Sequence, residues 1–238
     1  MRHILSDIKN LRIQGAEAVA RAGISYLKEL CSQNKASTSR DLHRHLKSGA
    51  AELLSLRPTE PMLYNVLYYS LLEEPRGSLA LYREYMLLRL NQLQTTLNTH
   101  RAYIEDLGVA ALSFPTRVYT HCHSSTVTNI ILAAHRKGRR VTVVNTETRP
   151  LYQGRKTAME LATAGVRVRH YVDSAARLAL KESDVMLIGC DSITPTRIVN
   201  KIGSEMISEI AHQFDIPIYV CTHSLKFDPR ALYGRETP

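Results

Sequence analysis

The sequence predicts an α/β protein with an amino-terminal helical domain followed by a parallel sheet with crossover helices. In residues 78–107, apolar side chains recur every three or four positions, as one face of a long helix requires. After Pro115, short β-branched runs alternate with stretches of helix-like composition, which is typical of parallel strands joined by helices. The composition agrees, because 44% hydrophobic and 22% charged residues are typical of a globular chain.

The amino-terminal part is expected to contain three or four helices. The most regular helical pattern covers residues 78–107, where Ser78 is available as the N-cap. The polar residues 32–38 and the proline-containing residues 57–61 interrupt the weaker patterns that precede it. These weaker helical patterns cover residues 15–30 and 39–56.

Five runs rich in β-branched residues are expected to be the strands of the sheet. A helical stretch separates each run from the next, which predicts a Rossmann-like domain over residues 108–238. Residues 1–107 are expected to form the helical domain, including the long helix. The expected strands are 118–120, 141–144, 166–171, 185–188 and 216–221, and the expected helices between them are 126–137, 157–164, 175–181 and 204–214.

Composition and charge narrow the class of protein. No apolar run approaches the ~20 residues that a membrane-spanning helix needs, and the amino terminus lacks the apolar core of a secretory signal, so a cytoplasmic protein is expected. A formal net charge of +9 favours phosphorylated or polyanionic ligands. The densest basic cluster, residues 135–140, has no interleaved aromatic side chains that would stack on bases. We therefore expect a solvated turn there and no nucleic-acid partner.

The cysteines are expected to be reduced thiols. No C-x-x-C pair is present, and the wide spacing of the four cysteines is unlike a disulfide framework or a zinc site. In the segment 121–123, neighbouring side chains of an extended chain would point to opposite faces, and no second cluster supplies further ligands. We therefore expect no metal and no other cofactor. The cysteines are Cys31, Cys122, Cys190 and Cys221.

Polar residues follow every expected strand. Ligands of open parallel sheets bind beyond the carboxyl ends of the strands, so these loops are the expected site. Cys122 follows the first strand, and Asp191 follows the fourth, where the preceding apolar run would desolvate its carboxyl group and raise its pKa. A thiol and an acid, with basic residues nearby, suit proton transfer on a phosphorylated and hydroxylated substrate. The other polar loops are residues 145–150, 173–174 and 222–224.

Each of these residues also has an ordinary structural interpretation. Most free cysteines are buried small apolar residues, so Cys122 alone does not indicate catalysis. Asp191 is equally suited to cap a helix or a turn. Glu147 and Arg149 could pair with each other at a strand end, and residues 200–201 could begin the next helix. The chain contains no complete glycine-rich motif for binding phosphates.

Five segments taken together resemble the superfamily of the translation initiation factor 2B regulatory subunits. They occur in the family's order and cover most of residues 118–203. Gln-Gly-Ala at 14–16 and Arg-Pro-Thr at 57–59 resemble the family's phosphate-contacting segments, which extends the resemblance to nearly the whole chain. The five segments are Thr-His-Cys-His-Ser at 120–124, Thr-Glu-Thr-Arg-Pro at 146–150 with Gln-Gly at 153–154, Val-Asp-Ser-Ala-Ala-Arg at 172–177, Gly-Cys-Asp-Ser-Ile at 189–193 and Asn-Lys-Ile-Gly at 200–203.

Within this superfamily the sequence is most similar to the archaeal ribose-1,5-bisphosphate isomerases, and less so to the methylthioribose-1-phosphate isomerases. The isomerases carry a cysteine after the first strand and an aspartate after the fourth, and Cys122 and Asp191 match both positions. The resemblance implies conversion of ribose 1,5-bisphosphate to ribulose 1,5-bisphosphate in AMP salvage by a homodimer or homohexamer, with AMP as a candidate activator. The alternative is a non-catalytic regulatory subunit that binds a sugar phosphate or a nucleotide.

The resemblance also implies roles for individual residues. Cys122 is expected to move the carbon-bound proton and Asp191 the oxygen-bound protons, and the reverse assignment is open. Many isomerases have arginine in place of Gln14, so one charged phosphate ligand is absent here. Relatives usually continue further beyond Lys226, so part of the sheet or of the oligomer interface could be absent. The expected substrate-binding residues are Gln14, Gly15, Ala16, Arg57, Ser124, Glu147, Arg149, Asn200, Lys201 and Lys226.

Overall fold

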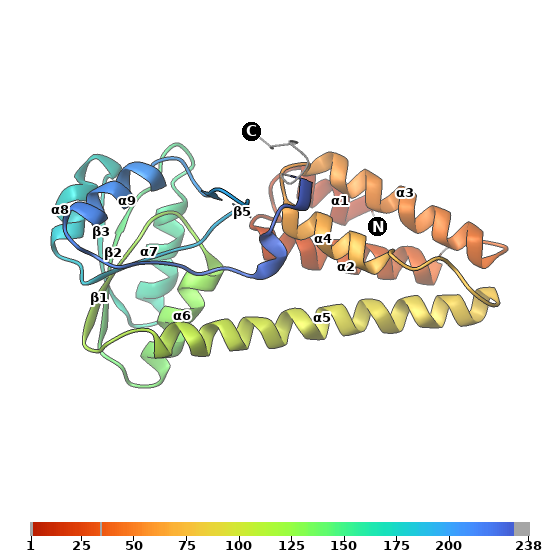
Figure 1. Cartoon of the computed structure of the whole chain (residues 1–238), viewed down its shortest axis with the longest axis horizontal. Helices are drawn as coiled ribbons and strands as arrows, with labels where there is room; N and C mark the ends of the chain where they lie inside the picture. The colour runs from red at the N-terminus through yellow and green to blue at the C-terminus, as the bar shows by residue number, and fades with distance from the viewer. Residues whose placement is uncertain (1, 34, 231–238) are drawn as a thin grey trace. The chain divides into compact units, whose positions relative to one another are not determined.

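A computed structural model describes residues 2–33 and 35–230, which form two compact units (Figure 1). The first unit contains residues 2–99, 192–197 and 224–230, and the second contains the remainder. Each unit is described by itself below. The expected domains, 1–107 and 108–238, stay a prediction. The units differ from them, because residues 192–197 and 224–230 belong to the first unit although they lie late in the chain.

The first unit is made of helices. The helices predicted at 15–30, 39–56 and 78–107 are confirmed, and the Ser78 hydroxyl caps the last of them by accepting a hydrogen bond from the N–H of Leu81 at 3.3 Å. The helices are α1 (Arg2–Lys9), α2 (Ala16–Gln33), α3 (Ser39–Leu56), α4 (Pro61–Ser70) and α5 (Leu79–Ala110), of which residues 79–99 belong to this unit.

Two helices of this unit, α1 and α4, were not predicted, so the expected number of three or four is too low for the residues described. Pro61 begins α4, as proline often does at a first helical position. Apolar residues are buried around most of the circumference of α4, which hides the period of 3.6 that marks a half-exposed helix. Among residues 3–9 of α1, whose burial is described, Ile8 alone is fully buried, so the helix is too short to show a periodic pattern.

The longest helix, α5, has 32 residues and contributes to the cores of both units. Met86, Leu90 and Leu97 are buried in the first unit, whereas Val109 is buried in the second. Neither α5 nor any other helix in the described part of the chain is long and apolar enough to cross a membrane.

The second unit is built on a five-stranded parallel sheet in the order β3-β2-β1-β4-β7. All five predicted strands and the predicted helices between them are confirmed, with ends shifted by a few residues. The strands are β1 (Thr116–Thr120), β2 (Val141–Thr146), β3 (Arg167–Tyr171), β4 (Val185–Ile188) and β7 (Ile218–Val220). The helices are α6 (Ser125–Arg136), α7 (Gln153–Thr163), α8 (Ala176–Lys181) and α9 (Ser204–Gln213).

Helices cover both faces of this sheet. Side chains alternate along a strand, so Val118 and Tyr119 point to opposite faces. Val118 packs with Ile130 of α6 and Leu161 of α7, whereas Tyr119 packs in a separate core with Ala179 of α8 and residues of α9. These three layers are the Rossmann-like arrangement that the sequence predicts.

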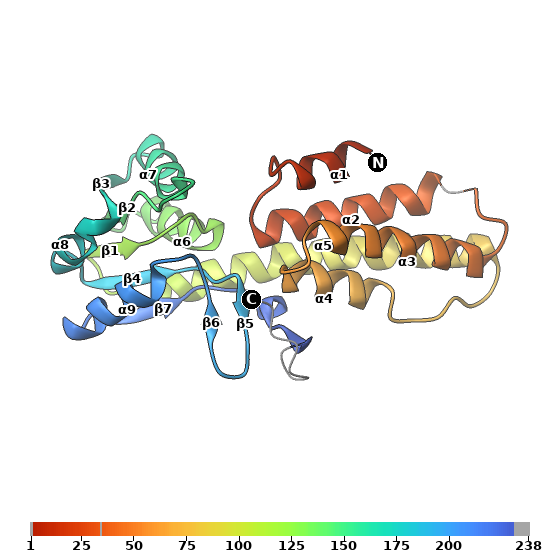
Figure 2. The same cartoon turned by 90° about the horizontal axis from the view of Figure 1, so that it is seen from above.

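Two short strands, β5 (Ser192–Ile193) and β6 (Ile198–Val199), follow β4 and were not predicted (Figure 2). Strands of two residues are too short to show alternation, and Pro195 between them reads as a loop. The chain returns here so that the N–H of Asp191 donates to the carbonyl of Val199 at 2.8 Å. The segment that contains β5 and β6 therefore begins and ends beside Asp191, a predicted catalytic residue.

Candidate active site

The strand order contains one reversal, between β1 and β4. The chain passes from β1 through β2 to β3 on one side, and then crosses to β4 on the other side of β1. Ligands of open parallel sheets bind beyond the carboxyl ends of the strands at such a reversal. Cys122 follows β1 and Asp191 follows β4, so the two predicted catalytic residues come from the two strands that flank the reversal.

Cys122 is held in a left-handed backbone conformation, with a φ of 69°. For a residue other than glycine this costs about 1–2 kcal/mol, so the surrounding contacts must maintain it. The N–H of Cys122 donates to Oγ1 of Thr148 at 2.8 Å, and its carbonyl accepts from Oγ1 of Thr157 at 3.0 Å. Thr148 follows β2 and Thr157 lies on α7, so two neighbouring elements fix the peptide groups of Cys122.

The thiol of Cys122 is protonated at neutral pH. Burial raises its pKa above the ordinary value of 9.0, and the carboxylates of Asp191 and Asp173 raise it further. A hydrogen bond from the backbone of His123 and the positive charge of Lys201 act in the opposite direction, but burial has the largest effect. Cys122 is therefore a proton donor at neutral pH, and Asp191 and Lys201 both lie within electrostatic reach of it.

His121 connects the end of β1 to the loop before α9. Its Nδ1 lies 2.8 Å from Oγ1 of Thr146, and its Nε2 lies 3.0 Å from the carbonyl oxygen of Ile202. A carbonyl oxygen can only accept, so Nε2 carries the proton and Nδ1 accepts from Thr146. Burial lowers the pKa of His121, which keeps the ring neutral. Within the described residues, no cluster of three or more His, Cys, Asp or Glu side chains is arranged to hold a metal ion.

Ser124 lies between the start of α6 and the end of β4. Its Oγ accepts a hydrogen bond from the N–H of Val127 at 3.4 Å, so Ser124 is the N-cap of α6. A Cβ atom at Gly189 would lie 2.6 Å from this Oγ. Glycine at the end of β4 therefore leaves the space that Ser124 occupies, while the expected contact of Ser124 with substrate stays a prediction.

Asp173 lies two residues after the end of β3 and was not predicted as a site residue. Its carboxylate accepts from the N–H of Thr148 at 2.8 Å and from the N–H of Arg149 at 2.7 Å. Thr148 has a left-handed φ of 63°, so this loop also needs external support. Asp173 therefore positions the loop that holds Cys122. Its signals in the sequence were its place near a strand end and in the family segment 172–177, but its hydrogen-bond partners lie 24 and 25 residues away.

Glu147 and Arg149 do not pair with each other, contrary to the structural interpretation of the sequence. Glu147 pairs with Arg155 at 3.0 Å. Arg149 donates to the hydroxyl of Tyr152 and lies 4.7 Å from the centre of its ring, and Arg155 lies over the same ring at 3.8 Å. Two guanidinium groups thus share one aromatic ring, but only Arg155 pairs with the carboxylate, which leaves the exposed Arg149 available for an anion.

Asp191 is exposed, which corrects the expectation that burial would desolvate its carboxyl group. The apolar run of β4 continues only to Cys190, which is buried, and the chain then turns outward. Asn200 donates to Oγ of Ser204, the first residue of α9, at 2.9 Å. This agrees with the structural interpretation that residues 200–201 lead into a helix.

The remaining predicted binding residues lie in the first unit. Residues 14–16 lead into α2, and Arg57 follows α3, where its guanidinium pairs with Glu60 at 3.2 Å. The buried Nε of Arg57 has no hydrogen-bond partner in the described part of the chain. Lys226 lies in a single 3-10 turn, and Asn65 of α4 donates to the carbonyls of the residues on either side of it, both at 2.8 Å.

Gly154 fixes α7 against the end of β2. A Cβ atom at this position would lie 1.8 Å from the carbonyl oxygen of Thr146. We predict that Gly154→Ala lowers the free energy of unfolding by about 3 kcal/mol, because the backbone of β2 cannot move away. Urea unfolding measures this change. Gly138→Ala is the control, since its Cβ would meet nothing within 4 Å and only its positive φ would cost free energy; equal losses in the two variants would contradict the steric explanation.

His123 makes the stability of the protein depend on pH. Its Nδ1 lies 3.0 Å from Oγ1 of Thr157, which itself donates to Cys122, so Nδ1 carries the proton. Burial, with a contribution from Lys156, lowers the pKa of His123 from 6.5 to about 4. Between these two values the unfolded chain binds the proton and the folded chain does not, so the free energy of unfolding falls as the pH falls through this window.

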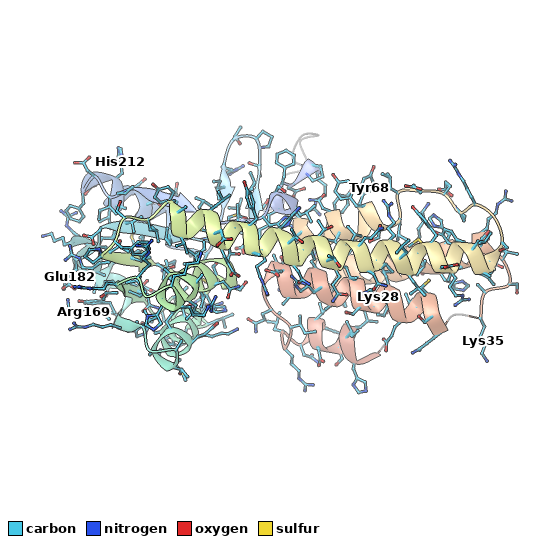
Figure 3. The ribbon with its side chains drawn as sticks, turned by 90° about the horizontal axis from the view of Figure 1, so that it is seen from below. Lys28, Lys35, Tyr68, Arg169, Glu182 and His212 are labelled. Atoms are coloured by element: carbon cyan, nitrogen blue, oxygen red, sulfur yellow. The ribbon has the colours of Figure 1, made fainter. Side chains whose placement is uncertain are left out.

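We predict that His123→Gln makes this pH dependence shallower by about 1–2 kcal/mol between about pH 7 and about pH 4.5. Glutamine retains an N–H donor for Thr157 but does not titrate. Urea unfolding at several pH values measures the difference, and His212→Gln, at an exposed position on α9 (Figure 3), is the matched control. An unchanged slope in His123→Gln would show that other groups cause the loss of stability.

Comparison with known proteins identifies the family of the chain. The model of the Initiation factor 2 subunit family matches residues 12–238. The chain belongs to this family. The ribose 1,5-bisphosphate isomerase of Pyrococcus furiosus is 32% identical over 243 residues, which cover 98% of this chain and 74% of that protein. The methylthioribose-1-phosphate isomerase of Pelotomaculum thermopropionicum is 30% identical, with coverage of 99% and 69%.

Solved structures of the Initiation factor 2 subunit family share the fold. The Pyrococcus horikoshii translation initiation factor eIF-2B superposes with a TM-score of 0.85 at 25% identity, over 95% of this chain and 79% of that one. The assignment made from the sequence, to this superfamily and with archaeal ribose-1,5-bisphosphate isomerases among its relatives, is confirmed. The relatives include isomerases and proteins named as initiation factors.

Proposed function

We propose that this chain is an aldose–ketose isomerase that converts ribose 1,5-bisphosphate to ribulose 1,5-bisphosphate. The observation that carries the proposal is the protonated thiol of Cys122 within electrostatic reach of Asp191 and Lys201, at the strand reversal. Isomerisation needs one group that gives a proton and one that takes a proton, and phosphate needs a cation. The identity of 30–32% to several proteins named ribose 1,5-bisphosphate isomerase supports this choice of substrate.

The residues permit a balanced sequence of proton transfers. Cys122 gives its proton to the ring oxygen as the bond from C1 to that oxygen breaks. Asp191 takes the proton from C2, and the electron pair of that C–H bond becomes the C1–C2 double bond of an enol. Asp191 then returns the proton to C1, while the Cys122 thiolate takes the proton of the C2 hydroxyl, which becomes the ketone. Both side chains regain their starting states.

This assignment reverses the roles expected from the sequence. There, Cys122 was expected to move the carbon-bound proton. A thiol whose pKa is raised by burial holds its proton at neutral pH, and the carboxylate of Asp191, which lies within electrostatic reach of that thiol, is the candidate base. The protonated thiol therefore favours Cys122 as the initial acid, which leaves Asp191 as the initial base.

The two phosphates of the substrate need several cations. We assign Lys201 and Arg149 of the second unit to phosphate binding, because Lys201 lies near Cys122 and Arg149 makes no ion pair among the described residues. Arg57 and Lys226 of the first unit keep the phosphate-binding role that the family resemblance implies. Gln14 offers an amide in place of a guanidinium, so it would contribute less to affinity.

The experiment that tests this proposal compares two substrates. Purified protein is supplied with ribose 1,5-bisphosphate or with methylthioribose 1-phosphate, with and without AMP, and the ketose product is measured. We expect kcat/KM to be at least about 100-fold higher for the bisphosphate, because two phosphates match the basic residues assigned above. A preference for methylthioribose 1-phosphate would assign the chain to the activity named for its Pelotomaculum relative.

A non-catalytic subunit that binds a sugar phosphate or a nucleotide is the second candidate. Gln14 favours this candidate. The loss of a charged phosphate ligand lowers the rate of an enzyme at low substrate concentration, whereas a sensor needs only to bind its ligand. A relative from Pyrococcus horikoshii, 29% identical, is named as a putative initiation factor subunit. Binding of ribose 1,5-bisphosphate by the folded protein without any turnover would select this candidate.

We also infer that the chain associates with copies of itself, as a dimer or a hexamer. Ile198, Ile202 and Met206 of the second unit are exposed, with Ile202 76% accessible. Exposed apolar side chains favour association when a partner can cover them. Light scattering of the purified protein measures the mass, and a monomer at micromolar concentration would contradict this inference.

A further inference from the structure

A second group of charged residues lies at the opposite edge of the sheet, where the strands begin. An open hollow of about 720 Å³ is lined there by residues from β1, β2 and β3 and from the turns that precede them. This edge is the far end of the strands from Cys122, so the hollow is separate from the proposed active site. Its wall contains four arginines: Arg117, Arg139, Arg140 and Arg167.

Strand register fixes the spacing of two of these arginines. Arg117 pairs with Thr142 of β2, which pairs with Arg167 of β3. Residues paired across parallel strands point to the same face, and neighbouring strands lie ~4.8 Å apart. The Cα atoms of Arg117 and Arg167 are therefore ~10 Å apart, with the small Thr142 between them. Arg169, on the same face of β3, is instead paired with Glu182 (Figure 3).

The other two arginines come from the turn after α6, and backbone hydrogen bonds fix their positions. The N–H of Arg139 donates to the carbonyl of Ala134 at 3.0 Å, and the carbonyl of Arg140 accepts from the N–H of Thr116 at 3.1 Å. The guanidinium of Arg139 lies 5.6 Å from the centre of the Phe114 ring. The turn is exposed, as the sequence predicts, but its arginines face the same hollow as those of the strands.

Positive charge exceeds negative charge around the hollow. Asp184 pairs with Arg117 at 2.6 Å, and this hydrogen bond lowers the pKa of Asp184. Among the described residues, Arg139, Arg140 and Arg167 make no ion pair. The carboxyl ends of α6 and α7 also face this edge and add roughly half a negative charge each. Four guanidinium groups therefore leave an excess of roughly two positive charges.

We propose that this hollow binds a small polyphosphate, such as the diphosphate or triphosphate group of a free ligand. A guanidinium group can donate two hydrogen bonds to phosphate oxygens, and the three arginines of the wall that make no ion pair among the described residues suit a chain of phosphates better than a single one. No Phe, Tyr or Trp lines the hollow, so a platform on which the bases of RNA would stack is absent from its wall. The proposal does not depend on the proposed isomerase function.

The test uses the full chain and inorganic tripolyphosphate. Isothermal titration calorimetry at fixed ionic strength compares the unmodified protein with Arg140→Gln and Arg167→Gln, each of which is expected to weaken binding roughly tenfold. Arg136→Gln is the matched control, because it makes the same change of charge on α6 outside the lining of the hollow and is expected to weaken binding less than about twofold. Lys201→Gln removes a cation at the proposed active site and is expected to leave the affinity unchanged.

Three results would overturn the proposal. Equal weakening by Arg136→Gln and Arg140→Gln would mean that only net charge matters. Loss of binding in Lys201→Gln would place the polyphosphate at the other edge of the sheet. Tighter binding of a single-stranded oligoribonucleotide than of tripolyphosphate, abolished by Arg140→Gln, would make the hollow a nucleic-acid site. Circular dichroism and an unchanged Tm establish that each variant is folded.

Discussion

Replacing Cys122 by serine is expected to lower kcat for ribose 1,5-bisphosphate isomerisation by about 1000-fold. The two side chains have nearly the same shape, and the hydrogen bonds that hold the backbone of residue 122 come from Thr148 and Thr157, so the loop should keep its conformation. A serine hydroxyl is a far weaker acid than even a thiol whose pKa is raised by burial. Removal of a positioned acid costs typically two to four orders of magnitude in rate.

Product formation, followed by phosphorus NMR, measures this loss. Cys221→Ser is the matched control in the same unit: Cys221 is buried, and its Sγ lies 3.8 Å from the carbonyl oxygen of Tyr219. We expect the control to retain at least about half of the activity, since Cys221 follows β7 and not β1 or β4, the two strands that flank the reversal. Near-normal activity in Cys122→Ser would remove the thiol from the mechanism.

Replacing Asp191 by asparagine is expected to cause a loss of similar size, about 1000-fold in kcat. The variant keeps the size of the side chain but removes the base that takes the proton from C2. Because Asp191 is exposed, and the variant keeps the backbone N–H that donates to Val199, the variant should fold. Substrate binding should weaken far less than turnover, because the cations assigned to phosphate binding remain.

Isotope exchange separates this base from a merely structural role. With substrate deuterated at C2, the unmodified protein should release part of the deuterium to water, whereas Asp191→Asn should release almost none. Asp215→Asn is the control, since Asp215 is also exposed and its left-handed φ of 55° suits asparagine. Complete retention of deuterium at C1 with the unmodified protein would indicate a hydride shift and contradict proton transfer.

Much of the fold could be predicted because its signals are local. The β-branched runs of β1 to β4 and the regular apolar spacing of α5 each lie within one short window of sequence. Elements whose signal is not local were missed. The helix α4 is apolar on most sides and shows no period, and β5 and β6 are two residues long.

The residues of the candidate site also differ in whether a local signal in the sequence marks them. Cys122 and Asp191 could be predicted because strand ends and the family's motifs mark their positions. Asp173 has the same marks, but its role could not be predicted, because that role depends on hydrogen bonds to a loop that only the folded sheet brings close. The neutral state of His121 depends likewise on the carbonyl of Ile202, 81 residues away. The exposure of Asp191 follows from the outward turn after β4, which no local pattern announces.

The most direct test of proton transfer at the strand reversal is a phosphorus NMR time course of ribose 1,5-bisphosphate with the unmodified protein. It is run beside Cys122→Ser and Asp191→Asn, with binding of the substrate measured separately for all three proteins. We predict that ribulose 1,5-bisphosphate accumulates with the unmodified protein alone, although all three bind the substrate. Binding without any conversion by the unmodified, folded protein would contradict the isomerase and identify a non-catalytic sugar-phosphate-binding protein.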